Sequence, residues 1–93
     1  MTIGVLKAQI FIPDSNSLKA KRMVLHSLTS RLRNSFNIAV SQVADDDKWQ
    51  KATLAVVAVQ KSRTHVDSLF SGVVNFIEGF NAVSLLDYEI ELL

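Results

Sequence analysis

The stretch PDSNSLKAKRMVLHSLTSRLRNSF, residues 13–36, decides how the chain folds. At about 100° per residue its apolar side chains recur on one side of a helical wheel, which predicts an amphipathic helix behind a turn. Pro13 ends the segment before it because proline has no backbone donor. Ser17 is the expected helix cap, with Ser15 as the alternative. The predicted core face consists of Leu18, Val24, Leu25, Leu28, Leu32 and Phe36.

Basic side chains on this helix form a stripe beside the core face. Lys19, Arg22 and Arg33 fall on the stripe, whereas Lys21 falls inside the apolar arc. We expect the Lys21 stem to pack and its ammonium group to reach water past the end of the sheet. Two interpretations stay open. The stripe is either a solvated surface, or a phosphate-binding site formed by Lys19, Lys21, Arg22 and Arg33, with the ribosome or rRNA as the possible partner.

The segments around this helix predict strands and a second helix. Residues 2–12 and 51–60 are apolar on both faces, as is typical of central strands, and residues 37–44 suit an edge strand. Residues 83–92 alternate, so Leu86, Tyr88, Ile90 and Leu92 are expected to face the core and Asp87, Glu89 and Glu91 to face outward.

A second amphipathic helix is predicted over residues 63–80, with Thr64 as its cap. Its polar side carries a stripe of small residues formed by Ser68, Gly72, Asn75 and Gly79. Because Gly inside a helix costs about 0.5–1 kcal/mol relative to Ala, the stripe indicates either a surface that another element approaches closely or a tolerated solvent face.

The predicted order of strand, helix, strand, strand, helix, strand is typical of the ferredoxin-like α+β fold, a βαββαβ sandwich. Its four-stranded antiparallel sheet has both helices on one face, and Lys7 lies beside Glu89 as a cross-strand neighbour. The other face keeps Ile3, Val5 and Phe11, and such a patch is usually covered. We therefore expect a homo-oligomer, with a dimer favoured.

Length and composition favour a globular protein rather than a disordered one, because 48% of the residues are hydrophobic and only 20% are charged. The 93 residues suit a single domain over 1–93, and the absence of cysteine excludes disulfides and thiolate metal sites. Neither a basic leader nor a membrane-length apolar run is present, so we expect a cytoplasmic protein without membrane contact.

No catalytic constellation, cofactor motif or metal-ligand spacing is found, so we expect a non-catalytic protein with no cofactor and no metal. The consecutive acids Asp45, Asp46 and Asp47 cannot all face one cation. Trp49 is either a packed hairpin residue or an exposed stacking platform, and Gln50 fits either role. An interaction or small-ligand surface formed by Trp49, Gln50 and the small-residue stripe remains the alternative to phosphate binding.

The run from Pro13 through Ser17, Lys19 and Arg22, together with the Trp49-Gln50 pair and the ending LLDYEIE at residues 85–91, resembles the YlxP-like family of small bacterial proteins of unknown function. The resemblance covers nearly the whole chain. It implies a ferredoxin-like fold and a bacterial cytoplasmic protein. The family's genes often lie beside those for translation initiation and ribosome-binding factor A, which implies ribosome or RNA work by association. No catalytic residues are implied.

Overall fold

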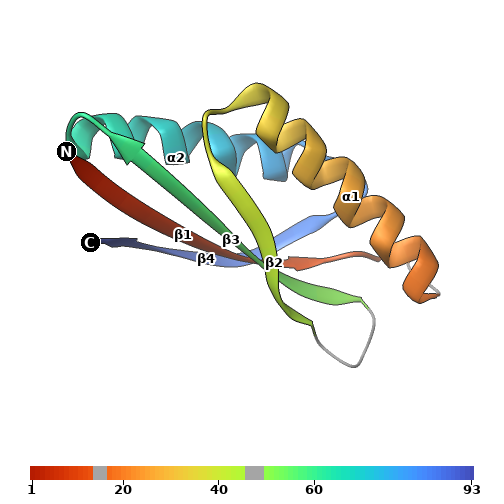
Figure 1. Ribbon diagram of the computed structural model, residues 1–93. Coiled ribbons are helices and arrows are strands. Elements are labelled where there is room, and N and C mark those ends of the chain that lie inside the picture. The colour runs from red at the N-terminus through yellow and green to blue at the C-terminus, as the bar shows by residue number, and fades with distance from the viewer. Residues whose placement is uncertain (14–16, 46–49) are drawn as a thin grey trace.

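A computed structural model of the chain shows the predicted order of elements (Figure 1). The structure describes residues 1–13, 17–45 and 50–93. The fold class is confirmed as a ferredoxin-like α+β sandwich, with both helices on one side of the sheet. Its elements are β1 (Thr2–Phe11), α1 (Leu18–Ser35), β2 (Ala39–Asp45), β3 (Lys51–Gln60), α2 (Arg63–Glu78) and β4 (Ser84–Leu92).

The sheet is antiparallel throughout its described strands, in the order β2-β3-β1-β4. The predicted central position of β1 and β3 is confirmed. Leu6 of β1 lies between Val56 of β3 and Ile90 of β4 in register, and residues directly opposite share one face of a sheet. The register shifts between Gln9 and Ile10, where β4 carries one extra residue.

The core lies between the helices and the sheet. Leu25, Leu28 and Leu32 of α1 are buried, as the wheel predicts, and each is worth about 1.5–3 kcal/mol of burial. Leu18 is half exposed, so its assignment to the core face is wrong. The reason is its position as the first residue of α1, next to the exposed cap Ser17. From α2 the core receives Val66, Phe70, Val73, Val74 and Ile77.

Serine is the N-terminal cap of both helices. Ser17 caps α1 as predicted, since its Oγ accepts the Ala20 N–H at 3.1 Å. For α2 the predicted cap Thr64 is wrong. Ser62 occupies the cap, its Oγ accepting the His65 N–H at 3.4 Å and lying 2.6 Å from His65 Nδ1. The helix therefore begins one residue before Thr64.

Candidate functional site

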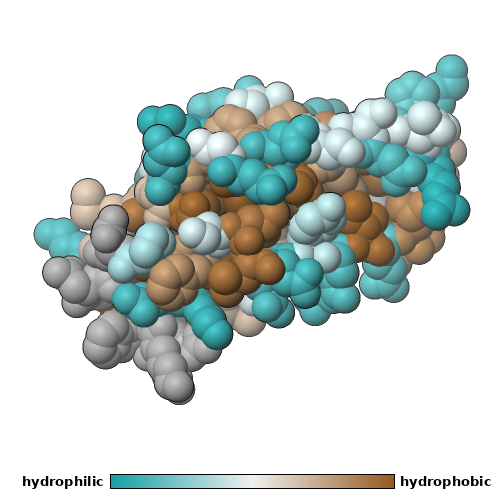
Figure 2. Space-filling view, turned by 180° about the vertical axis from the view of Figure 1, so that it is seen from behind, coloured by the Kyte–Doolittle hydropathy of each residue, from teal (hydrophilic) through white to brown (hydrophobic). Residues whose placement is uncertain are grey.

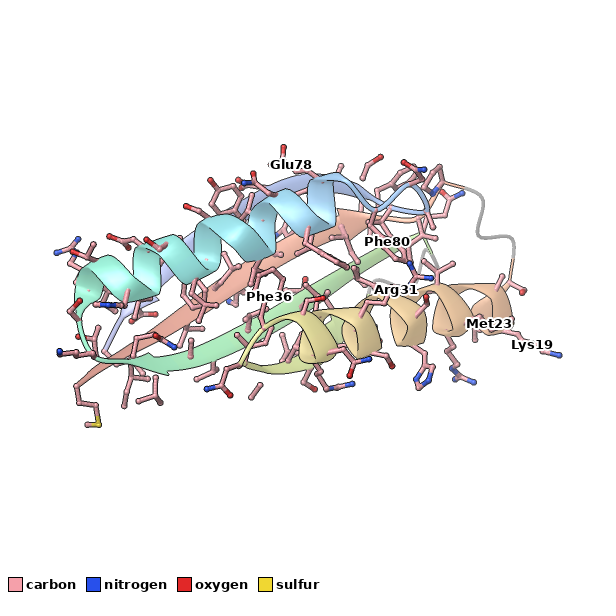
Figure 3. The ribbon with its side chains drawn as sticks, turned by 90° about the horizontal axis from the view of Figure 1, so that it is seen from above. Lys19, Met23, Arg31, Phe36, Glu78 and Phe80 are labelled. Carbon is pink, nitrogen blue, oxygen red and sulfur yellow. The ribbon has the colours of Figure 1, made fainter. Side chains whose placement is uncertain are left out.

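The basic residues that the sequence assigned to the phosphate-binding site on α1 differ in exposure and in contacts. Lys19 and Arg22 are exposed on the first turns of the helix, and Lys19 points away from the body of the molecule (Figure 3). Lys21 is only 1% exposed and is one of the largest fully buried side chains. The expectation that its ammonium reaches water is wrong, because the core arc of α1 is covered even at its first turn. Lys21 therefore does not present its charge at the surface.

The other arginines of α1 contact the protein itself. Arg33 Nη2 donates to the Val40 carbonyl at 2.9 Å, a part-buried hydrogen bond that joins the end of α1 to β2. The Arg31 guanidinium carbon lies 5.6 Å from the centre of the Phe80 ring, a cation–π contact between α1 and the segment after α2 (Figure 3). The Arg33 bond joins α1 to the sheet, and the Arg31 contact joins α1 to the segment after α2. Arg33 is therefore only partly available to an external phosphate.

Contacts within the protein explain part of the small-residue stripe of α2. A Cβ at Gly72 would lie 3.0 Å from Phe36 Cε1, so the close approach comes from the residue that follows α1. Gly79 is the C-terminal cap of α2, and its N–H donates to the Asn75 carbonyl at 3.0 Å. Ser68 and Asn75 are exposed. Gly79 is exposed as well, so the close approach at Gly72 explains only that position, and the stripe stays a candidate interaction surface.

A row of aromatic rings between the helices was missed by the sequence reasoning. The rings of Phe36 and Phe76 meet edge to face, with centres 6.1 Å apart, and Phe76 stacks on Phe80 at 6.4 Å. Such pairs add about 0.5–1.5 kcal/mol beyond burial. The signal in the sequence was the spacing of Phe76 and Phe80 by four residues, but the partner Phe36 comes from another element.

Of the predicted Trp49-Gln50 pair, only Gln50 can be placed. Trp49 lies outside the described residues, as do Ser15, Asp46 and Asp47. Gln50 is half-buried, and its carbonyl accepts the Ile12 N–H at 2.7 Å, which extends the β1–β3 ladder. Within residues 1–13, 17–45 and 50–93, no cluster of metal-ligating side chains is found. Over the same residues, none of the helices has the length and hydropathy to cross a membrane.

The sheet face opposite the helices carries an apolar patch. Val59 of β3 is 55% exposed and Val57 is also exposed, while Ile3 and Val5 of β1 are half-buried. The register pairs Ile3 with Val59 and Val5 with Val57, so the four side chains are contiguous on one face. We call these four residues the open-face patch.

An acidic row borders the open-face patch on β4. Asp87, Glu89 and Glu91 are exposed on this face, and Glu89 is the direct neighbour of Lys7, as predicted. No ion pair joins Lys7 to Glu89 in the described part of the chain. A hollow of about 300 Å³ lies along Lys7, Glu89 and Glu91, and a second of about 90 Å³ continues beside Asp87. The row therefore presents carboxylates to solvent along the edge of the sheet.

The helix side of β4 is only partly covered. Leu92 packs against the core as expected, whereas Leu86, Tyr88 and Ile90 are exposed, contrary to expectation. Tyr88 and Ile90 are 46% and 42% exposed, although their register partners Ala8 and Leu6 are 1% and 0% exposed. Leu86, at the extra residue of β4, is half exposed as well. We call Leu86, Tyr88 and Ile90 the β4 strip. Figure 2 shows apolar surface in a broken band across this side of the molecule.

The architecture defines the class as a ferredoxin-like sandwich in which the described elements leave one sheet face uncovered. The chain belongs to the family described as "Protein of unknown function (DUF503)", whose model matches residues 3–90. It is 35% identical over 78 residues to the uncharacterized protein YlxP of Bacillus subtilis (strain 168), covering 84% of this chain and 85% of that protein. The family resemblance predicted from the sequence is confirmed, and the family's description assigns no function.

Solved structures share the fold at low sequence identity. SnoaB, a cofactor-independent oxygenase from Streptomyces nogalater, superposes with a TM-score of 0.55 at 9% identity, covering 100% of this chain and 92% of that one. Rv0793 from Mycobacterium tuberculosis has a TM-score of 0.52 at 14% identity, covering 100% and 93%. The de novo designed protein Foldit4 has a TM-score of 0.53 at 11% identity, covering 100% and 97%. These likenesses show the fold alone.

Proposed function

We propose that the protein is a non-catalytic interaction module that self-associates through the open-face patch. The observation that carries this proposal is the contiguous exposure of Val57 and Val59 beside Ile3 and Val5. Burial of apolar surface contributes about 25 cal/mol per Å², and contiguous exposed apolar patches mark interaction sites in soluble proteins. A sheet face of this kind packs well on another sheet face, with the strands nearly aligned.

Charge favours a second copy of the chain as the partner of this face. A two-fold interface places the same patch against itself, so like charges must stay apart. The acidic row lies on β4, whereas the outer strand on the other side, β2, exposes the small uncharged Ala39 and Ser41 on the same face. With the two-fold axis parallel to β3 and close to it, the acidic rows of the two copies lie at opposite rims of the interface. The dimer then buries valines and keeps the carboxylates in water.

The first prediction is that Val59→Lys separates the dimer into monomers. A lysine within the open-face patch brings two ammonium groups together when β3 packs along β3 of the second copy, which opposes association. Sedimentation or light scattering from micromolar to millimolar concentration should show a dimer for the parent protein and a monomer for the variant. Met23→Lys is the matched control, because Met23 is an exposed apolar residue on α1, on the helix side. A parent protein that stays monomeric at millimolar concentration contradicts the proposal.

A second candidate function is phosphate binding by the start of α1, and it is supported by the exposure of Lys19 and Arg22. The two residues are three apart on a helix and therefore lie on the same side. Lys21 does not contribute at the surface, and Arg33 holds the Val40 carbonyl. With two phosphate contacts, the logarithm of the binding constant falls with the logarithm of the salt concentration. The slope is only about −1.4 on a single strand and about −1.8 on a duplex. Binding by one protomer is then weak.

The second prediction tests this candidate with rRNA fragments and ribosomal subunits as probes. Combined Lys19→Glu and Arg22→Glu should remove most of the binding and most of its salt dependence. Lys61→Glu with Arg63→Glu is the control, because it makes the same charge change at exposed residues by the start of α2. If both double variants lose binding equally, net charge explains it and α1 is not the site.

A further inference from the structure

Strand β4 is an edge strand, and its register shows which backbone groups face outward. Leu93 N–H donates to the Ile3 carbonyl at 2.9 Å, so this pair belongs to the hydrogen-bonded type. Hydrogen-bonded and non-bonded pairs alternate in an antiparallel ladder. The backbone groups of the even-numbered residues Tyr88, Ile90 and Leu92 therefore point away from β1. They lie on the outer edge of the sheet.

One of these outward groups is capped by the chain itself. The Tyr88 N–H donates to Asp87 Oδ1 at 2.8 Å, which agrees with an outward-facing amide. In the described part of the chain, no corresponding cap is found on Ile90 or Leu92. The edge is therefore open to a further strand along the C-terminal half of β4 and closed near Asp87.

The two sides of this edge differ in chemistry. On the helix side lie Tyr88 and Ile90 of the β4 strip, and on the other side lie Glu89 and Glu91 of the acidic row. Charges on an edge strand commonly prevent edge-to-edge aggregation, which accounts for the carboxylates alone. Protection against aggregation does not explain why Tyr88 and Ile90 expose nearly half of their surface. Together the two sides form a template of apolar and acidic positions.

We propose that the β4 edge binds an extended segment of a partner protein whose side chains alternate between apolar and basic, so that the segment adds a strand to the sheet. Its outward carbonyls and amides would pair with those of Ile90 and Leu92. Its apolar side chains would lie against Tyr88 and Ile90, and its basic ones against Glu89 and Glu91. The hollow of about 300 Å³ beside Lys7, Glu89 and Glu91 leaves room for long basic side chains.

Charge disfavours a second copy of this chain as the occupant. Pairing of β4 with β4 sets Glu89 and Glu91 against carboxylates of the same row, and like charges directly opposite are destabilising. The other edge of the sheet, β2, offers Ala39 and Ser41 and contains no basic residue. Self-association uses the open-face patch and not the β4 edge. An experiment can therefore contradict either proposal without contradicting the other.

The experiment uses a short capped peptide that alternates valine and lysine as the probe, titrated into the isotopically labelled protein. Saturable shifts at the amides of Ile90 and Leu92 are expected. A peptide that alternates valine and glutamate should not bind, and a valine–lysine peptide with N-methylated backbone amides should lose binding, because it lacks the donors of a strand. Equal binding of the N-methylated peptide would overturn strand addition.

Variants of the protein locate the site. Glu89→Lys with Glu91→Lys should weaken the valine–lysine peptide about tenfold, since two cross-strand attractions become repulsions. Glu78→Lys is the control, because Glu78 is an exposed acid near the end of α2, on the helix layer (Figure 3). The affinity of the Glu78→Lys variant for the valine–lysine peptide should equal that of the parent protein. Equal weakening by both variants, or shifts confined to other strands, would overturn the proposal. Repeating the titration in Val59→Lys should give the same affinity.

Discussion

Replacing Lys21 with alanine is expected to lower the free energy of unfolding by about 2–5 kcal/mol, the range for truncating a long buried side chain. Lys21 is 1% exposed and lies one turn before Leu25 on the same side of α1. Its stem fills core volume that alanine leaves empty. Urea unfolding followed by circular dichroism measures the loss. In a domain of this size total stability is about 5–15 kcal/mol, so the change is large.

Two further variants separate volume from charge at Lys21. Lys21→Met keeps a flexible chain of similar length and removes the ammonium, so it should recover only the part of the stability lost in Lys21→Ala that the stem contributes. Lys19→Ala, at an exposed position two residues earlier, should stay within about 0.5 kcal/mol of the parent. If Lys21→Ala and Lys19→Ala behave alike, Lys21 is not buried in solution. If Lys21→Met is as unstable as Lys21→Ala, the charge matters more than the stem.

Hydrophobic periodicity predicted the elements and their order because it reports on the face that each element turns to the core. The expected strand at residues 51–60 matches β3 at both ends, and the order led directly to the fold. Periodicity does not report how deep a position lies. The wheel placed Lys21 inside the apolar arc, but burial of the whole side chain depends on what covers the first turn of α1. The usual behaviour of lysine, whose ammonium group reaches water, was therefore the wrong prediction for Lys21.

The same limit applies to the candidate sites. Alternation in β4 correctly placed Tyr88 and Ile90 on the helix side, yet whether that side is covered depends on where α2 lies over the sheet. Arg33 belongs to the basic stripe on the wheel, but its hydrogen bond to the Val40 carbonyl requires the placement of β2. Contacts between different elements depend on how those elements are placed in space, whether they are neighbours in the chain, like α1 and β2, or distant from each other, like β4 and the core of β1.

Replacing Gly4 with alanine is expected to lower the free energy of unfolding by about 1–3 kcal/mol, the usual cost of overpacking a core. An added Cβ would lie 2.6 Å from Val66 Cγ1 and 2.9 Å from Phe70 Cε2, both buried side chains of α2. Gly4 thus sets how closely α2 approaches β1. The loss runs against the intrinsic effect, because alanine is favoured over glycine in a strand by about 0.5–1 kcal/mol. For a small domain this corresponds to a fall in Tm of roughly 4–8 °C per kcal/mol.

A double-mutant cycle tests whether the contact with Val66 is the cause. Val66→Ala alone removes core volume and destabilises the protein, but it also removes the atom that the new Cβ would meet. The Gly4→Ala, Val66→Ala double variant should therefore lose less stability than the sum of the single losses, with a coupling of about 0.5–3 kcal/mol. Gly79→Ala is the control, since a Cβ there meets its nearest atom, the Asn75 carbonyl oxygen, at an ordinary 3.4 Å. Strict additivity of the two changes would show that α2 shifts to accommodate the methyl group, and that Gly4 does not fix its distance from β1.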